Sequence, residues 1–136
     1  MNDIGIQAPK IAVLGATEEV NDKIQSSKDA YDLMKDFSQD PDFKGSIAGP
    51  ISLDLALSQA ASQLKEYHSE VAGQADILVS PDMTTGNILS KALTILGKGR
   101  LATIVKGAQV PIVMNSRGSS SDEKVFALLL ALFSWR

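Results

Sequence analysis

The feature that most constrains the fold is an alternation of short apolar runs with longer stretches of helical periodicity, joined by turns rich in Gly, Pro or Ser. The first run, residues 10–14 (KIAVL), is continuously apolar after its lysine, as expected for a parallel strand that is covered on both faces. Strands that alternate with helices build parallel sheets with helices packed on their faces. The pattern therefore predicts an α/β fold.

Turn residues divide the chain into elements. We predict strands at residues 10–14, 46–48, 75–79, 101–105 and 110–114. Ser26 or Ser27 is expected to cap the first helix. Gly49-Pro50 should break the second strand, and Ser52 should cap one helix that runs through Leu64. Residues 82–87 are predicted to form a loop before the next helix, and the last helix follows a serine-rich turn.

The composition limits the size of the core and the class of partner. With 136 residues, 44% of them hydrophobic, the chain can build one core and hardly two, so we expect a single domain at 1–136. A net charge of -3 without a basic run argues against nucleic acid. The chain has no cysteine, one histidine, no signal-peptide pattern and no apolar run near the ~20 residues that span a bilayer. We therefore expect a cytoplasmic protein without a metal site or membrane partner.

A candidate anion site lies near the C-terminus, where a predicted strand ends at Ser116-Arg117 and a serine-rich turn opens an apolar helix. The first N–H groups of a helix are unpaired, and arginine adds a planar fork of donors suited to phosphate or carboxylate. This pattern indicates an anion site. The alternative is that residues 120–123 (SSDE) form only a capping box, with Asp122 and Glu123 as an acidic first turn.

Four polar loops are predicted beyond the carboxyl ends of strands, which is where ligands bind in open parallel sheets. Glycine recurs in three of these loops, and it lets backbone N–H groups approach a ligand closely. Each loop taken alone is more simply explained by the ordinary turns of an α/β domain. Together they predict one binding crevice, built from Gly49, Pro50, Asp54, Asp82, Gly86, Asn87, Lys106, Gly107, Ala108, Ser116, Arg117, Asp122 and Glu123.

Several motifs follow one another in a fixed order. They are residues 11–23 (IAVLGATEEVNDK), 49–58 (GPISLDLALS), 71–82 (VAGQADILVSPD), 86–87 (GN), 107–113 (GAQVPIV) and 116–117 (SR). This series resembles the phosphate acetyl/butyryltransferase family and looks closest to its butyryl branch. The resemblance covers nearly all of this chain but about half of the family's length, which implies the C-terminal half of such a protein without its N-terminal domain. It also implies a three-layer α/β/α fold with a mostly parallel sheet, like that of isocitrate and isopropylmalate dehydrogenases.

The resemblance implies reversible transfer of a short acyl group between coenzyme A and inorganic phosphate, giving acyl phosphate. Coenzyme A is then a substrate, and no metal or permanently bound cofactor is needed. Such chemistry needs an acceptor for the thiol proton, donors for the oxyanion and a cation that holds phosphate. By resemblance, Arg117 binds phosphate, Ser116 donates to the oxyanion, and Glu123 or Asp122 takes the proton. The glycine-bearing loops would bind the substrates.

A function of another class also fits, namely a non-catalytic dimerisation or regulatory fragment that keeps this fold. Members of the family are typically homodimers, and Leu53, Leu57 and Leu64, or the Leu93–Leu96 face, could form a symmetric apolar patch. Trp135 is expected on an exposed contact surface. A generic nucleotide-binding domain is disfavoured, because no G-x-G-x-x-G follows the first strand and no G-x-x-x-x-G-K-[ST] occurs.

Overall fold

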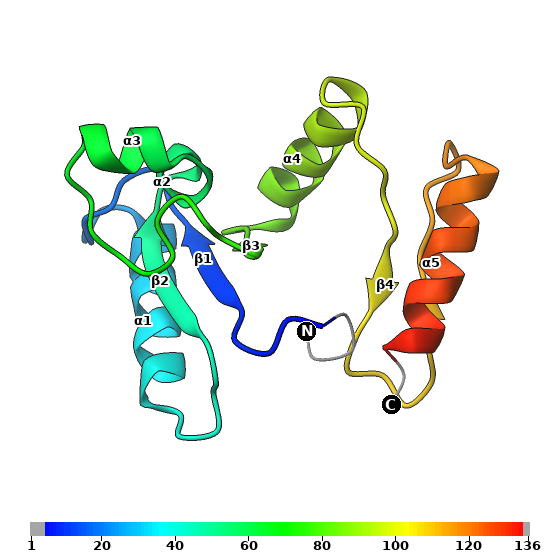
Figure 1. The fold of residues 1–136 in the computed structure, drawn as a ribbon, viewed down its shortest axis with the longest axis horizontal. Helices are drawn as coiled ribbons and strands as arrows, with labels where there is room; N and C mark the ends of the chain where they lie inside the picture. The colour runs from blue at the N-terminus through cyan, green and yellow to red at the C-terminus, as the bar shows by residue number, and fades with distance from the viewer. Residues whose placement is uncertain (1–4, 135–136) are drawn as a thin grey trace. The chain divides into compact units, whose positions relative to one another are not determined.

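The computed structural model describes residues 5–134, which fall into two compact units (Figure 1). Residues 6–86 form one, which we call the sheet unit, and residues 87–134 with Gly5 form the other, which we call the hairpin unit. Trp135 lies outside the described residues, and a single domain at 1–136 stays a prediction.

The sheet unit is built on three parallel strands, β1 (Lys10–Leu14), β2 (Ser46–Ile51) and β3 (Ile77–Val79), in the order β2-β1-β3. Ala12 pairs with Ala48 on one side of β1 and with Leu78 on the other. The central position explains why the β1 sequence is continuously apolar, since residues 12–14 are all buried. The parallel sheet with helices confirms the predicted α/β class.

The first helix, α1 (Gln25–Gln39), packs on β1 and β2. It begins earlier than the sequence predicted, with Ile24 at the N-cap and no side-chain cap. Ser27 is buried within the first turn, where its hydroxyl accepts a hydrogen bond from the Asn21 N–H at 2.8 Å and donates to the Asn21 carbonyl. Ser27 therefore ties down the loop before the helix, and the predicted serine caps are wrong.

The second strand does not end at Gly49-Pro50, as predicted, but continues through both residues to Ile51. Pro50 has no N–H to donate, and the register with β1 shifts between Ala12 and Leu14. A β-carbon on residue 49 would lie 2.8 Å from the Val13 Cβ and 2.9 Å from the Ala30 carbonyl oxygen. Glycine is thus required here by the close packing of β2 against its neighbours.

The single helix predicted from Ser52 to Leu64 is two short helices, α2 (Leu53–Leu57) and α3 (Gln59–Leu64). They are separated at Ser58, whose backbone is extended and whose hydroxyl accepts a hydrogen bond from the Ala61 N–H at 3.2 Å. The serine side chain caps α3 and so competes with a continuous helix. The predicted boundary is therefore corrected at Ser58.

The predicted loop at residues 82–87 is instead the first part of a helix, α4 (Met83–Ile95). The Asp82 carboxylate accepts hydrogen bonds from the Thr85 N–H at 2.8 Å and from the Thr85 hydroxyl at 3.0 Å. Asp82 thus acts as a helix cap, which the nearby proline and glycine concealed in the sequence.

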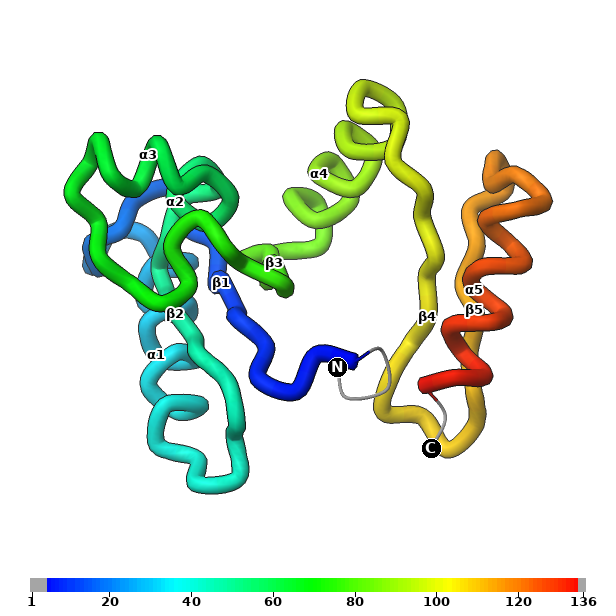
Figure 2. The backbone as a smooth tube through the Cα atoms, viewed as in Figure 1, coloured from blue at the N-terminus to red at the C-terminus, as the bar shows by residue number. Residues whose placement is uncertain are grey.

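In the hairpin unit, β4 (Ile104–Val105) pairs with β5 (Ile112–Val113), and the pairing is antiparallel. Figure 2 shows the chain reversing between the two strands. The predicted strands at 101–105 and 110–114 therefore shorten to two residues each and leave the parallel arrangement. The last helix, α5 (Ser121–Phe133), packs on both strands.

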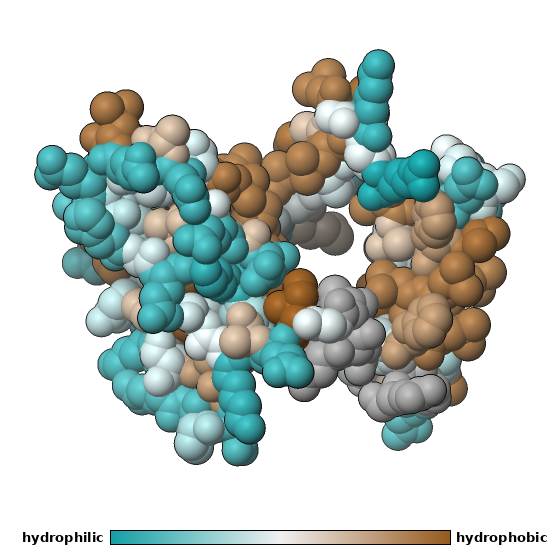
Figure 3. Space-filling model, in the orientation of Figure 1, coloured by the Kyte–Doolittle hydropathy of each residue, from teal (hydrophilic) through white to brown (hydrophobic). Residues whose placement is uncertain are grey.

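Much of the α5 surface is apolar and exposed. The buried residues of α5 are Ala127 and Ala131. The large apolar side chains on its outer surface, brown over α5 in Figure 3, are Val125, Leu128, Leu129, Leu132 and Phe133. Within residues 5–134, no helix is long and apolar enough to cross a bilayer.

Candidate functional site

The Ser116-Arg117 turn lies between β5 and α5, as the sequence predicted. Both side chains are exposed, and the Ser116 carbonyl accepts a hydrogen bond from the Ser119 N–H at 3.0 Å. Neither ion pair found in the described part of the chain involves Arg117. The guanidinium therefore stands in solvent with its donors available, close in sequence to the start of a 13-residue helix.

The start of α5 is a capping box. The Ser120 hydroxyl accepts from the Glu123 N–H at 3.2 Å, and the Glu123 carboxylate accepts from the Ser120 N–H at 2.9 Å. The capping interpretation of residues 120–123 is thus confirmed. Glu123 is engaged by the backbone, whereas Asp122 beside it is exposed in the first turn.

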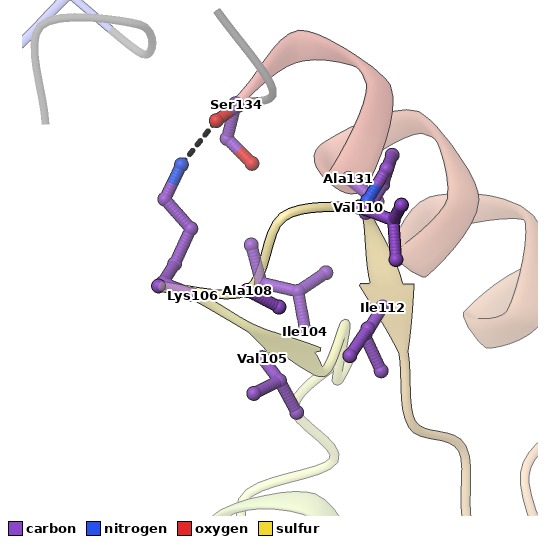
Figure 4. A pocket seen from close by; sticks show the side chains of 10 residues that line it. Ile104, Val105, Lys106, Ala108, Val110, Ile112, Ala131 and Ser134 are labelled. Carbon is purple, nitrogen blue, oxygen red and sulfur yellow. Dashed lines mark hydrogen bonds between the residues drawn. The ribbon is translucent and has the colours of Figure 1, made fainter.

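Gly107 and Ala108 lie in the turn between β4 and β5 and line a cavity of about 280 Å³ together with Lys106 (Figure 4). Because the two strands are antiparallel, this turn and the Ser116-Arg117 turn are at opposite ends of the pair. The prediction that both loops meet at one edge of a parallel sheet is therefore wrong for these residues.

Gly49 and Pro50 are packing residues within β2. Pro50 is buried, and a β-carbon on Gly15 would lie 2.8 Å from the Pro50 Cβ. The pair therefore interlocks the end of β2 with the start of the loop after β1.

Asp54 lies beyond the end of β2, in the first turn of α2, and its carboxylate is 3.0 Å from the Lys65 Nζ. The neighbouring Ser52 hydroxyl and the Lys65 ammonium lower the pKa of Asp54 to about 2. The same ion pair raises the pKa of Lys65. A serine hydroxyl has one proton to donate, and the Ser52 hydroxyl donates it to the Glu18 carboxylate. While that hydrogen bond is formed, Lys65 is the donor that remains for the Asp54 carboxylate.

The Asp82 carboxylate is held by hydrogen bonds from the Thr85 N–H and hydroxyl in its own helix. These hydrogen bonds lower the pKa of the Asp82 carboxyl. Gly86 lies against Ser80, whose hydroxyl oxygen would be 3.2 Å from a β-carbon on residue 86. Asn87 is exposed in the hairpin unit, and its carbonyl accepts from the Ser90 hydroxyl at 3.0 Å. None of these contacts distinguishes a substrate site from ordinary helix capping and packing.

The sheet unit also holds an open cavity of about 670 Å³ that the sequence analysis missed. It is lined by residues 17–23, Leu55, Lys65 and Tyr67. Burial and the charge of Glu18 raise the pKa of the Tyr67 hydroxyl. The loop after a central parallel strand is a recognised place for ligands, so residues 17–23 could have been found, whereas Lys65 and Tyr67 carry no motif. Within residues 5–134, no cluster of three acidic or histidine side chains could hold a metal ion.

Comparison with known proteins gives a consistent result along the chain. The family described as phosphate acetyl/butaryl transferase matches residues 1–132. The phosphate acetyltransferase of Thermotoga maritima is 41% identical over 131 residues, covering 96% of this chain and 44% of that protein. The phosphate butyryltransferase of Clostridium acetobutylicum is 40% identical over 129 residues, covering 94% of this chain and 42% of that protein.

A solved structure supports the same relationship. The crystal structure of a branched-chain phosphotransacylase from Enterococcus faecalis V583 superposes with a TM-score of 0.87 at 37% identity, over 97% of this chain and 47% of that one. The chain thus spans less than half the length of each of these proteins. Acetyl and butyryl members match it at similar identity, so the comparisons do not separate the two branches.

Proposed function

The chain belongs to the phosphate acetyl/butaryl transferase family, and we propose that it supplies the C-terminal α/β part of an enzyme that moves a short acyl group between coenzyme A and inorganic phosphate. The observation that carries the proposal is the family match over residues 1–132, which includes the exposed Ser116-Arg117 turn before α5. Acyl phosphate, phosphate and coenzyme A are its proposed partners. A homodimer in the cytoplasm is part of the same proposal.

In the direction that forms acyl-coenzyme A, the coenzyme A thiol attacks the carbonyl carbon of the acyl phosphate. A C–S bond forms, the C–O bond to phosphate breaks, and inorganic phosphate leaves. The Arg117 guanidinium is suited to hold the phosphoryl group through paired N–H donors. The Ser116 hydroxyl can donate to the oxyanion that develops at the carbonyl.

The thiol must lose its proton before it attacks, and two acids lie near the start of α5. Because one oxygen of the Glu123 carboxylate accepts from the Ser120 N–H, protonating this group would weaken the capping box. Asp122 is exposed and takes no part in that box. We therefore assign the proton acceptor to Asp122, from which the proton can pass to the departing phosphate.

Thioester formation from butyryl phosphate and coenzyme A, repeated with acetyl phosphate, tests the proposal and ranks the acyl chains. Arg117→Ala should abolish turnover, whereas Arg117→Lys should retain part of it, because lysine keeps the charge but not the paired donors. Asp122→Asn should reduce kcat more than Glu123→Gln does. Circular dichroism of each variant separates loss of chemistry from loss of fold. Equal turnover in both amide variants and the parent would remove the base assignment.

A non-catalytic dimerisation fragment is the second candidate, and the exposed apolar side chains favour it. Leu64 is 87% exposed and Leu96 81% exposed, and the outer face of α5 is apolar as well. Such surfaces commonly mark contacts with other chains. A folded chain that forms dimers in analytical ultracentrifugation, but gives no thioester at low or high protein concentration, would favour this function over the acyltransferase.

A further inference from the structure

One side of the open cavity in the sheet unit is formed by a loop. Residues 17–23, which lie between β1 and α1, line that side, and Leu55, Lys65 and Tyr67 line the other. All of these residues belong to the sheet unit. Leu55 lines the cavity although its side chain is only 1% exposed. A reagent in solution therefore reaches Leu55 when a wall of the cavity moves.

The loop is fixed at both ends and held at one point between them. The Gly15 N–H donates to a carbonyl of β2 at 3.0 Å, and the Asn21 N–H donates to a buried serine of α1 at 2.8 Å. Between these anchors, Glu18 accepts a hydrogen bond from the hydroxyl of Ser52, the N-cap residue of α2. Among residues 5–134, this is the one hydrogen bond or ion pair that joins residues 16–20 to another part of the chain.

The Ser52 hydroxyl has one proton to donate and two carboxylates beside it. It donates to Glu18, yet it is also the main cause of the low pKa of Asp54, so the Asp54 carboxylate lies within its reach. Lys65 lies 3.0 Å from Asp54, and the charge of Glu18 also helps to raise the pKa of Lys65. Moving the Ser52 proton from Glu18 to Asp54 exchanges one charge-assisted hydrogen bond for another, so the two arrangements are close in free energy.

We infer that residues 16–20, which we call the lid, open and close over this cavity, held shut while Ser52 donates to Glu18 and released when Ser52 donates to Asp54. The inference stands on the sheet unit alone and does not depend on the proposed acyl transfer. An element with two arrangements of similar free energy is shifted by any molecule that prefers one of them. Entry to the cavity is then limited by the opening of the lid.

The test is thiol labelling, because the chain has no cysteine and an introduced one is a unique probe. Leu55→Cys places a thiol at the cavity, and Ile51→Cys places one at a fully buried position that does not line it. The rate of reaction of each 136-residue variant with Ellman's reagent is measured, with and without Ser52→Ala. The ratio of the Leu55→Cys rate to the Ile51→Cys rate, the labelling ratio, reports opening of the lid apart from general unfolding.

Ser52→Ala should raise the labelling ratio at least about fivefold, because it removes a hydrogen bond to a charged group. The Ser52 side chain makes no cap hydrogen bond to α2, so this variant leaves the helix cap as it was. Glu18→Ala should raise the ratio by a similar factor, and the double variant should raise it no further. Ser58→Ala removes a cap of α3 and leaves the lid contact in place, so it should not change the ratio.

Asp54→Ala should have the opposite effect and lower the labelling ratio at least about twofold. Without Asp54, the Ser52 proton has Glu18 as its one carboxylate acceptor, and Lys65 is free to pair with Glu18 as well. A residue that serves only the stability of this region would not change the ratio in opposite directions in these two variants.

Three results would overturn the inference. They are an unchanged labilling ratio in Ser52→Ala, equal acceleration at positions 51 and 55, and a raised ratio in Asp54→Ala. If Leu55→Cys does not fold, nitrogen-15 relaxation of the cysteine-free chain replaces the labelling. Ser52→Ala should then lower the backbone order parameters of residues 16–20 and leave those of β1 unchanged, and unchanged values at residues 16–20 would equally end the inference.

Discussion

The two units differ in how far they bury their apolar side chains. Of the eleven buried hydrophobic residues in the described chain, nine lie in the sheet unit and two, Ala127 and Ala131, in the hairpin unit. Both of the latter are alanines, whereas the sheet unit buries Ile51, Leu55 and Val71 almost completely. Burial of large apolar side chains is the main source of folding stability.

Most of the stability and the proposed chemistry therefore belong to different parts of this chain. The Ser116-Arg117 turn and Asp122 belong to the unit with two-residue strands and, among the described residues, only two buried apolar side chains. Segments with few buried contacts open locally at low free-energy cost. The hairpin unit should therefore exchange its amide hydrogens faster than the β1–β3 sheet does.

Two matched leucines should show the strongest contrast between the units. Leu55 is 1% exposed and Leu128 is 55% exposed. Leu55→Ala should lower the free energy of unfolding by about 2–5 kcal/mol, because it removes buried methyl groups and leaves a cavity. Leu128→Ala should cost less than about 1 kcal/mol. Urea unfolding of both variants checks this, and equal losses would contradict the difference between the units.

The second effect contrasts two glycines. A β-carbon on residue 49 would meet Val13 and the Ala30 carbonyl, whereas one on residue 118 would meet nothing within 4 Å. Gly49→Ala should destabilise by about 1–3 kcal/mol through overpacking. Gly118→Ala should be close to neutral in the same thermal-unfolding experiment. A neutral Gly49→Ala variant would show that β2 can move away from α1.

The third prediction compares the removal of one helix cap in each unit. Ser120→Ala removes the hydroxyl that accepts from Glu123, and Ser58→Ala removes the one that accepts from Ala61. Each should cost about 1 kcal/mol of local stability. Hydrogen exchange should place the loss in α5 for the first variant and in α3 for the second. Global loss from Ser120→Ala would mean that the hairpin unit does not open independently.

The smallest effect is the acid response of Asp54. Its pKa in the folded chain is about 2, below the ordinary 3.8. Since the folded pKa is depressed, the stabilisation is present above about pH 4 and is lost as pH falls toward 2. Asp54→Asn should flatten this part of the acid-unfolding curve, with Asp122→Asn as the control, because neither ion pair of residues 5–134 involves Asp122. Identical acid limbs in parent and Asp54→Asn would contradict the ion pair with Lys65.

The sequence predicted the sheet unit better than the hairpin unit, for a physical reason. The run at 10–14 is continuously apolar after Lys10, and such a run is buried on both faces when it lies in the middle of a parallel sheet. The position of β1 could therefore be predicted from this pattern. Residues 104–105 and 112–113 are equally apolar but too short to fix their partner or direction. The direction of strand pairing depends on tertiary contacts, here the packing of β4 and β5 against each other and against α5. Local sequence patterns do not encode these contacts.

The local structure around the candidate site was predicted correctly where the residues are adjacent in sequence, and the prediction was wrong where two loops needed a shared edge. The Ser116-Arg117 turn and the capping box at 120–123 were both predicted from local motifs. The ion pair of Asp54 with Lys65 was not, because surface charges follow no periodicity. The predicted shared edge for residues 107–108 and 116–117 was wrong, because β4 and β5 are antiparallel, whereas a crevice built from the other loops stays a prediction.

The interlocking of Gly15 with Pro50 has a consequence for the way related sequences can vary. Since a β-carbon at position 15 would fall 2.8 Å from the Cβ of Pro50, the two positions constrain each other sterically. A side chain at position 15 should be accepted only together with glycine at position 50, because every other residue there keeps the β-carbon that blocks it. If Gly15 and Pro50 are both invariant among homologues, this packing is a sufficient reason, and their invariance would then carry no information about which molecule the protein binds.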